Sequence, residues 1–186
     1  MWGIVMLTIC LALIDEPSDK EKFLAIYDKY KNMMYNKAMS VLHVSSLAED
    51  AVQESLIKIA KNISKISSVD CSQTRSFIVI IVRNTSLNMI KSEHINRTEE
   101  IDESSPDVSM DVLSKVMSKQ GYEYLITLVN ELDDIYTDVL TLKLVMGYSN
   151  EEISSLLGVP RKTVDSRIYR GKKILQHKLE DYYGEK

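Results

Sequence analysis

The sequence predicts an all-α protein of two small helical domains joined by a flexible acidic linker. Of its 186 residues only 6 are Gly and 3 are Pro, which favours helices over turn-rich sheets. Apolar residues recur at three- and four-residue steps in two blocks, about 20–91 and 122–183. Between the blocks, residues 92–111 hold seven acidic residues against one Arg, and a Ser-Ser-Pro sequence interrupts any helix there. We therefore expect an apolar N-terminal extension (1–19), a first domain (20–91), an acidic linker (92–119) and a second domain (120–186).

The N-terminal segment, residues 1–14, carries no charge. It is shorter than the ~20 apolar residues that a bilayer span needs. It lacks the basic start and the cleavage site of a secretory signal, and the acidic Asp15 and Glu16 follow it. These features favour a translation start assigned too early, with Met6 as another candidate, or a helix packed on the domain. Contact with a membrane is the less favoured alternative.

Two helices are predicted at the start of the first block. One helical face is formed by apolar residues at three- and four-residue steps: Phe23, Ile26, Tyr27, Tyr30, Met34, Ala38 and Leu42. A capping box, Ser46 with Glu49, then predicts the start of a second helix. Its inward positions are Leu47, Ala51, Val52, Leu56, Ile59 and Ile63.

The segment RSFIVIIVRNTSLNMIK, residues 75–91, is ambiguous between strand and helix. Its β-branched run is typical of a buried strand, and periodicity alone does not separate the two. Apolar positions continue at Leu87 and Ile90 without a turn signal, and a lone strand would have no partner elsewhere in the chain. A helix is therefore favoured.

The second block predicts an apolar helix, a short helix and a longer helix. Its apolar positions are Leu132, Ile135, Tyr136, Val139, Leu140, Leu142, Val145 and Met146, and Gly147 ends it. A second capping box, Ser149 with Glu152, opens a short helix that Gly158 closes as a left-handed cap. Val159 is expected to fill the core in the turn, and Pro160 fits the first turn of the next helix. That helix places Val164, Ile168, Leu175 and Leu179 on one face.

Charge is distributed unevenly. The whole chain has a formal net charge of −4, yet residues 160–178 hold seven cations and one acid, a net charge of +6. A short helix, a glycine turn and a longer helix with a buried face form a helix-turn-helix. Cations on the second helix would bind DNA phosphates, and side chains at its start could contact base edges. The alternative is a solvated basic helix without a ligand.

Other function classes find little support. The cysteines, Cys10 and Cys71, form neither a CxxC pair nor a Cys/His cluster, so neither disulfides nor a metal site is expected. The sequence offers no nucleophile–base pair and no Gly-rich phosphate loop. We therefore expect no catalytic residues, no cofactor and no small-molecule substrate, and a cytoplasmic location.

Two motifs together carry a family resemblance. YSNEEISSLLGVPRKTVDSRIYRGKKILQHKL (148–179) resembles the C-terminal helix-turn-helix, region 4, of extracytoplasmic-function sigma factors of bacterial RNA polymerase. LAEDAVQESLIKI (47–59) and residues 75–91 resemble the polymerase-binding helix and the minus-ten helix of region 2 in the same family. Phe77 and Asn88 stand where the family usually has Trp and Asp. The order of both motifs across a linker is the specific part of the resemblance.

The resemblance implies three sets of binding residues. The polymerase-binding set is Glu49, Asp50, Gln53 and Glu54. The minus-ten set is Arg75, Arg83, Asn84, Asn88 and Lys91. The minus-thirty-five set is Arg161, Lys162, Thr163, Asp165, Ser166, Arg167, Arg170 and Lys173.

The resemblance also implies partners and a role. Core RNA polymerase, through its clamp helices and flap, and promoter DNA would be the partners, and many family members also bind an anti-sigma factor. The acidic linker resembles the segment that threads the active-site channel of the polymerase. We expect a non-enzymatic sigma factor that directs promoter-specific initiation. The alternative is a helix-turn-helix regulator that binds duplex DNA without polymerase.

Overall fold

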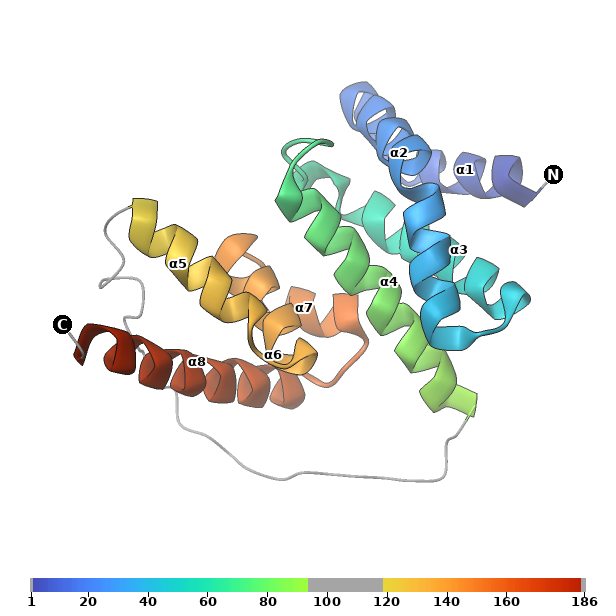
Figure 1. Cartoon of the computed structure of the whole chain (residues 1–186). Helices are drawn as coiled ribbons and strands as arrows, with labels where there is room; N and C mark the ends of the chain where they lie inside the picture. The colour runs from blue at the N-terminus through green and yellow to red at the C-terminus, as the bar shows by residue number, and fades with distance from the viewer. Residues whose placement is uncertain (1, 94–118, 185–186) are drawn as a thin grey trace. The chain divides into compact units, whose positions relative to one another are not determined.

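The computed structural model describes the backbone of residues 2–93 and 119–184, and every regular element in these two ranges is a helix (Figure 1). The prediction of an all-α protein with two helical domains is confirmed. The first compact unit is built on α1 to α4, and the second on α5, α6, α8 and the greater part of α7. Most of the predicted acidic linker, residues 94–118, lies outside the described residues. In chain order the helices of the first unit are α1 (Trp2–Ala12), α2 (Pro17–Leu42), α3 (Ser45–Lys61), the short 3-10 turn η1 (Ile63–Lys65) and α4 (Ser72–Glu93).

The core of the first unit lies between α2, α3 and α4, each of which packs against the other two. The predicted apolar face of α2 is confirmed, except that Tyr27 is partly exposed. On α3 the expected Leu47 and Val52 are only partly buried, and the small residues Ala48 and Ala60 are buried instead. Small side chains on α3 leave room for the large ones that α2 and α4 contribute.

The start of α3 differs from the prediction. The helix begins at Ser45, its N-cap residue is Val44, and no side chain caps it, so the capping box of Ser46 and Glu49 does not form. The reason is the short connection to α2. His43 ends α2 in the left-handed conformation (φ 57°) and Val44 is extended, so the next residue is already helical. The Ser45 hydroxyl donates to Glu49 across 3.4 Å instead.

The ambiguous apolar segment is helical, as predicted, and forms the middle of α4. Phe77, Ile78 and Ile81 are fully buried. The apolar face does not continue as expected, because Leu87 is 41% exposed and Ile90 is partly exposed. In this part of the helix Thr85 and Ser86 are buried, and the Ser86 hydroxyl donates to the carbonyl of the preceding turn at Val82 (2.9 Å).

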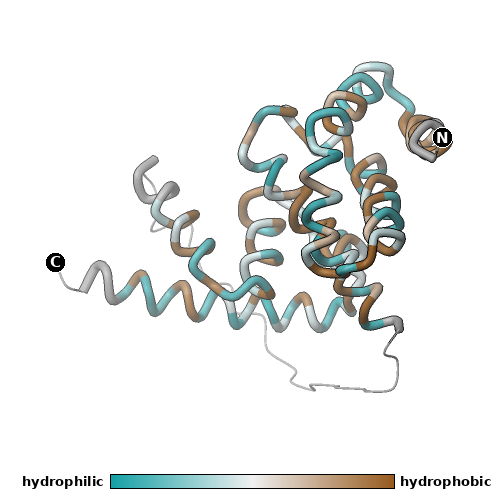
Figure 2. The backbone as a smooth tube through the Cα atoms, turned by 45° about the vertical axis from the view of Figure 1, so that its right-hand side comes forward, coloured by the Kyte–Doolittle hydropathy of each residue, from teal (hydrophilic) through white to brown (hydrophobic). Residues whose placement is uncertain are grey.

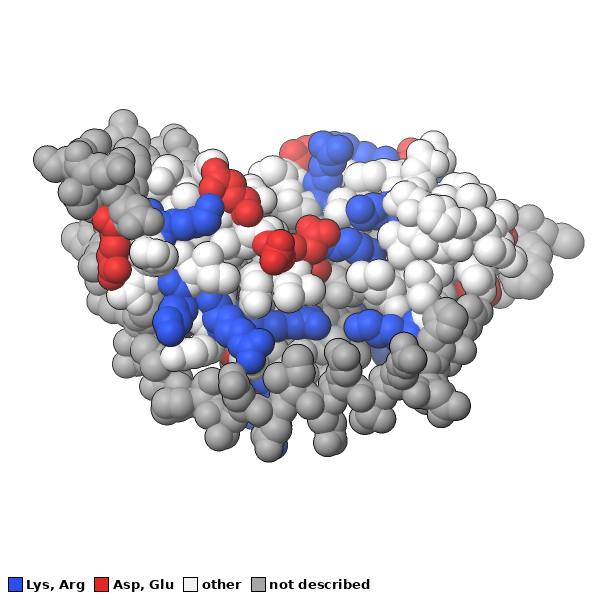
Figure 3. Space-filling view, turned by 60° about the horizontal axis from the view of Figure 1, so that its bottom comes forward, with Lys and Arg blue, Asp and Glu red and all other residues white. Residues whose placement is uncertain are grey.

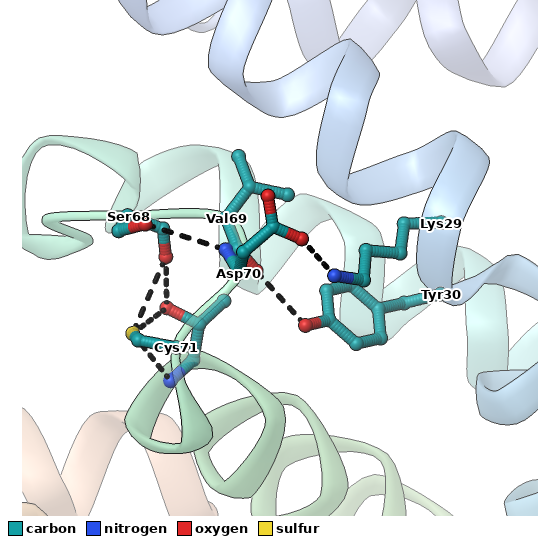
Figure 4. Close-up of polar contacts among 7 residues, drawn as sticks. Lys29, Tyr30, Ser68, Val69, Asp70 and Cys71 are labelled. Carbon is teal, nitrogen blue, oxygen red and sulfur yellow. Dashed lines mark hydrogen bonds and ion pairs between the residues drawn. The ribbon is translucent and has the colours of Figure 1, made fainter.

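The loop before α4 is tied to α2 by polar contacts (Figure 4). The Tyr30 hydroxyl donates to the Val69 carbonyl (2.9 Å), and Lys29 forms an ion pair with Asp70. Thr74, in the first turn of α4, donates through its hydroxyl to the Ser68 carbonyl (2.6 Å). The loop is therefore fixed at both ends, which sets where α4 begins.

Cys71 lies at the end of this loop, directly before α4. Burial opposes ionisation of its thiol, but hydrogen bonds from Thr74 and from nearby backbone amides outweigh that effect and lower the pKa of Cys71. The thiol thus takes the place of a capping side chain at the start of the helix.

The N-terminal segment forms a helix that contacts α3, in line with the expectation of a helix packed on the domain. Cys10 and Ile14 are buried, whereas Val5, Ile9 and Leu13 are exposed. Figure 2 shows the apolar character of this segment. No helix in the described part of the chain is both long and apolar enough to cross a bilayer.

The second unit consists of α5 (Lys119–Asn130), α6 (Asp134–Leu140), the π-helical turn η2 (Thr141–Val145), α7 (Asn150–Leu157) and α8 (Arg161–Gly184). The expected single helix is divided differently: Leu132 lies in the turn between α5 and α6, and η2 follows α6 directly. The Thr137 hydroxyl lies 2.9 Å from the carbonyl oxygens of both Val129 and Leu132, which share its single proton, and this hydrogen bond stabilises the turn. Ile135, expected inside, is exposed, while Val139, Leu140 and Leu142 are buried.

Candidate nucleic-acid interface

The start of α7 is fixed by the predicted capping box, which is confirmed. The backbone N–H of Ser149 donates to Glu152 (2.9 Å), and the backbone N–H of Glu152 donates to the Ser149 hydroxyl (3.2 Å). Before it, Gly147 adopts a left-handed conformation (φ 71°), and Tyr148 is buried. The box therefore sets the point at which the chain turns into α7.

The turn from α7 to α8 contains the left-handed glycine cap that the sequence predicts. Gly158 has φ 66°, the left-handed conformation expected of a helix C-cap. Val159 is partly exposed rather than fully buried, and its carbonyl accepts a hydrogen bond from the Ser154 hydroxyl (2.6 Å). Pro160 lies directly before α8, and its carbonyl accepts hydrogen bonds from Thr163 and Val164. Proline thus precedes the first turn rather than standing within it.

One face of α8 is buried against the rest of the second unit, so the opposite face is directed toward solvent. Val164, Ile168, Leu175 and Leu179 are buried, as predicted. Figure 2 shows the resulting alternation of apolar and polar residues along α8. Gly171 brings α8 close to α6, because a Cβ atom there would lie 2.8 Å from a methyl carbon of Leu140. Burial of this face leaves the basic side chains of α8 exposed or partly exposed.

The predicted minus-thirty-five residues differ in their exposure. Arg161, Lys162, Asp165 and Lys173 are exposed, whereas Thr163, Ser166, Arg167 and Arg170 are partly buried. Lys and Arg side chains gather in groups on the face of the molecule shown in Figure 3, with acidic side chains among them. At the start of α8 the exposed members of this set are therefore Arg161, Lys162 and Asp165.

Arg167 is partly buried and lies near α6. Desolvation by burial lowers the pKa of Arg167, and the nearby Asp138 and Tyr136 of α6 counteract part of this shift. Asp138 itself is buried. This position on α6 was not identified from the sequence, because no local pattern links it to a residue 29 positions later. Arg167 therefore lies close enough to Asp138 and Tyr136 of α6 to interact with them electrostatically.

Acidic side chains surround Arg161, the first residue of α8. Its guanidinium forms an ion pair with Glu151 of α7 and lies 3.7 Å from Asp165, measured from Nε to Oδ2. Asn150 donates from Nδ2 to Oδ1 of Asp165 at 2.5 Å. Helical spacing does not predict Asn150 or Glu151 as part of this site, since their role depends on the turn that brings α7 beside α8.

The predicted minus-ten residues all lie on α4. Arg75 and Lys91 are exposed, and Arg83, Asn84 and Asn88 are partly exposed. The spacing of Asn84, Asn88 and Lys91 places them on one helical face, whereas Arg75 lies roughly 13 Å before Asn84 along the axis. The Asn84 amide donates from Nδ2 to the Ile80 carbonyl (2.9 Å), which fixes the direction of its side chain.

The predicted polymerase-binding residues form an acidic face on α3. Glu49, Asp50 and Glu54 are exposed and Gln53 is partly exposed. Glu54 forms an ion pair with Lys58 one turn later (3.1 Å), as its i, i+4 spacing suggested. The face therefore presents carboxylates next to one another on the outer side of the core.

Among the described residues, no three His, Cys, Asp or Glu side chains lie together in a way that could hold a metal ion.

Comparison with known families covers both units. Residues 26–94 match sigma-70 region 2, and residues 122–175 match sigma-70 region 4. These two matches contain every residue of the three predicted sets of binding residues.

Comparison with individual proteins gives the same family. The chain is 29% identical over 174 residues to the ECF RNA polymerase sigma factor SigW of Bacillus subtilis (strain 168), covering 88% of this chain and 91% of that protein. It is 24% identical over 151 residues to the ECF RNA polymerase sigma factor SigM of the same organism, covering 81% and 91%. Among solved structures, that of CnrH in complex with the cytosolic domain of CnrY covers 95% of this chain and 96% of its own, at 15% identity and a TM-score of 0.36.

The chain matches region 2 and then region 4, in that order along the sequence, and the named relatives are ECF sigma factors. The chain belongs to the sigma-70 family and is an extracytoplasmic-function (ECF) RNA polymerase sigma factor.

Proposed function

We propose that this sigma factor divides its work among three helices: α3 binds core polymerase, α4 binds the minus-ten strand, and α8 binds the minus-thirty-five duplex. The observation that supports this most directly is the arrangement of α8. Its apolar face is buried, three of its basic side chains (Arg161, Lys162 and Lys173) are exposed, and a capped helix and a glycine turn precede it.

On α8, we assign base contacts to the residues at the helix start and phosphate contacts to those further along. Arg161 and Lys162 are exposed in the first turn, where a recognition helix meets base edges. Lys173 is exposed and Arg170 partly exposed two to three turns later. Cations at that distance from the helix start bind phosphates and position the helix without specifying sequence.

On α4, the proposed ligand is unstacked single-stranded DNA. Asn84 and Asn88 carry short amides that can bond the edge of an unpaired base, while Lys91 on the same face can hold a phosphate. Arg75 lies too far along the helix to contact the same nucleotide and would bind a neighbouring phosphate.

On α3, carboxylates on an exposed face suit a basic partner surface. Glu49, Asp50 and Glu54 would pair with cations of the clamp helices of the polymerase, and Gln53 would add a hydrogen bond. The factor itself would be non-catalytic, would act in the cytoplasm where polymerase meets DNA, and would accept an anti-sigma factor as a regulatory partner. Its own weak contacts would act together once the polymerase holds both domains.

Run-off transcription with purified core polymerase on genomic fragments tests this proposal. We expect specific transcription starts with the wild-type chain and their loss in the variant R161A/K162A/K173A, because three exposed cations of α8 are removed. A matched variant, K37A/K61A/K65A, removes the same charge from the first unit outside the proposed surfaces and should retain the starts.

Two outcomes would contradict the proposal. The absence of any specific start with the wild-type chain and core polymerase would refute its role in initiation. Tight, sequence-specific binding of duplex DNA by the free chain in a gel shift would instead favour a regulator that acts without polymerase.

A further inference from the structure

Four side chains join the start of α7 to the start of α8, and the proposed function leaves three of their interactions unexplained. The Arg161 guanidinium is paired with Glu151 from α7 and lies near Asp165, one turn further along α8. Asn150, the first residue of α7, donates a hydrogen bond to the other oxygen of the Asp165 carboxylate (2.5 Å). One cation that is placed to contact DNA therefore lies between two carboxylates.

The amide of Asn150 has a fixed orientation. Its Oδ1 atom is buried and accepts no hydrogen bond, while its Nδ2 atom faces Asp165. Rotating the amide by half a turn would place its oxygen against the carboxylate, which is electrostatically unfavourable. Asn150 thus holds Asp165 in a position from which its second oxygen faces Arg161.

The ion pairs themselves add little to stability. Arg161 is 61% exposed, and its partners Glu151 and Asp165 are 58% and 45% exposed. Exposed pairs of this kind contribute at most about 1 kcal/mol. A stabilising role alone therefore accounts poorly for two acids and an oriented amide at the start of the helix that is proposed to bind DNA.

The two acids affect possible DNA ligands of Arg161 unequally. A phosphate is an anion, so Glu151 and Asp165 repel it and compete with it for the guanidinium. Guanine offers the neutral acceptors O6 and N7, which meet no such repulsion, and the amine of a paired cytosine can donate to a carboxylate. The acids therefore penalise contact with the DNA backbone more than contact with a base edge.

We propose that Glu151 and Asp165 increase the sequence selectivity of α8 by weakening the binding of Arg161 to DNA phosphates, and that Asn150 positions Asp165 for this role. The proposal rests on the proposed function, in which α8 binds promoter duplex.

The test compares two affinities. The full-length chain is titrated with a random-sequence duplex, and its complex with core polymerase is titrated with a promoter fragment found by run-off transcription. In E151Q and D165N, we expect the affinity for random duplex to rise about two- to fivefold, the scale of an exposed ion pair. The slope of log affinity against log salt should become steeper by about one, because Arg161 is then free to neutralise a phosphate. Promoter affinity should change less, so the ratio of the two affinities falls.

A matched control and two double variants separate this role from a general effect of charge. E180Q removes one acid from α8 roughly 28 Å from Arg161, beyond the screening distance of ~8–10 Å, and should leave both affinities unchanged. In the R161A background, E151Q should no longer alter random-duplex affinity. N150A should act in the same direction as D165N, and N150A/D165N should match D165N alone. Thermal unfolding verifies that each variant is folded.

The outcomes are distinguishable. The selectivity role would be overturned if E151Q changed the affinity for random duplex equally with and without Arg161, or changed it in neither background. In that case the proposed function would still stand, provided that R161A weakens promoter binding. If R161A leaves promoter binding unchanged, the proposed contact between α8 and the promoter is wrong, and the selectivity role fails with it.

Discussion

Tyr148 shows how the environment of a single residue can make stability depend on pH. It is 1% exposed and lies just before α7. Burial, together with the nearby Glu152 carboxylate, raises the pKa of Tyr148 from 10.0 to about 12. The raised pKa means that the folded protein holds this proton more tightly than the unfolded chain does.

We predict that Tyr148 makes the second unit sensitive to alkali. Its contribution to stability is complete below the unfolded pKa of 10.0 and is lost as pH rises towards the folded pKa of about 12. At about pH 11, one unit above the unfolded pKa, the loss should be roughly 1 kcal/mol, since one pKa unit corresponds to about 1.4 kcal/mol.

Urea unfolding of the wild type and Tyr148→Phe at about pH 9 and about pH 11 measures this loss. The wild type should lose more stability than Tyr148→Phe between the two pH values, while Tyr27→Phe, at a partly exposed position, should behave as the wild type does. Parallel losses in the wild type and Tyr148→Phe would show that Tyr148 does not cause the sensitivity.

Single residues also mark where prediction from sequence ends. The exposure of Arg161, Lys162 and Lys173 follows from helical spacing once Val164 and Ile168 are known to be buried. The proximity of Arg167 to Asp138 does not follow, because Asp138 belongs to another helix. Spacing along the chain predicts which residues share a face, but not which residues of another helix lie opposite them.

At the scale of the helix, two identical capping signatures behave differently, and this difference can be tested. Ser149 forms its box, whereas Ser46 lies inside α3 and caps nothing. We predict that Ser149→Ala lowers the free energy of unfolding by about 1 kcal/mol, the usual value of an N-cap, and that Ser46→Ala changes it by less than about 0.5 kcal/mol.

Urea titration followed by circular dichroism measures both variants, and hydrogen exchange should show that the loss in Ser149→Ala is local to α7. The two substitutions remove the same hydroxyl from the same Ser-x-x-Glu pattern, so each serves as the control of the other. An equal cost at both positions would mean that the box at Ser149 contributes nothing beyond the local sequence.

The existence of the helices could be predicted from the sequence, but several of their boundaries could not. The helical state of the segment around Phe77 could be predicted from the lack of a partner strand, although Leu87 and Ile90, which were expected to continue its apolar face, are exposed and partly exposed. The start of α3 could not, because the left-handed conformation of His43 shortens the connection from α2. The break before α6 was also missed, since it depends on hydrogen bonds of Thr137 to carbonyls of the preceding turn. Periodicity predicts that a helix exists, whereas its ends depend on local backbone geometry.

At the scale of the whole molecule, charge is separated between the proposed binding surfaces. The chain has a net charge of −4, yet α8 carries exposed cations and α3 carries exposed carboxylates. A chain with a net negative charge is repelled by DNA at long range. In the proposed function, affinity for the promoter therefore depends on prior binding to polymerase through the acidic face of α3.

We predict that amide substitutions on this face weaken polymerase binding. In E49Q/D50N/E54Q three exposed carboxylates are lost, and the affinity for core polymerase should fall on the order of tenfold, the combined scale of three exposed ion pairs. The remaining affinity should also depend less on salt, because fewer ion pairs are screened. Sedimentation or fluorescence titration of the full chain with core enzyme at two salt concentrations measures both effects.

The variant D15N/E16Q/E21Q provides the control, since it removes three exposed carboxylates from the start of the chain and changes the net charge by the same amount. If polymerase affinity falls equally in both variants, net charge and not the α3 face determines binding. If it falls only in the α3 variant, promoter-dependent transcription should fall by the same factor at limiting enzyme, because DNA binding then follows polymerase binding. Polymerase binding would then precede promoter binding, because the carboxylates proposed to bind polymerase lie on α3 and the cations proposed to bind duplex DNA lie on α8. The charged residues concerned are Glu49, Asp50 and Glu54 on α3 and Arg161, Lys162, Asp165, Arg167, Arg170, Lys172, Lys173 and Lys178 on α8.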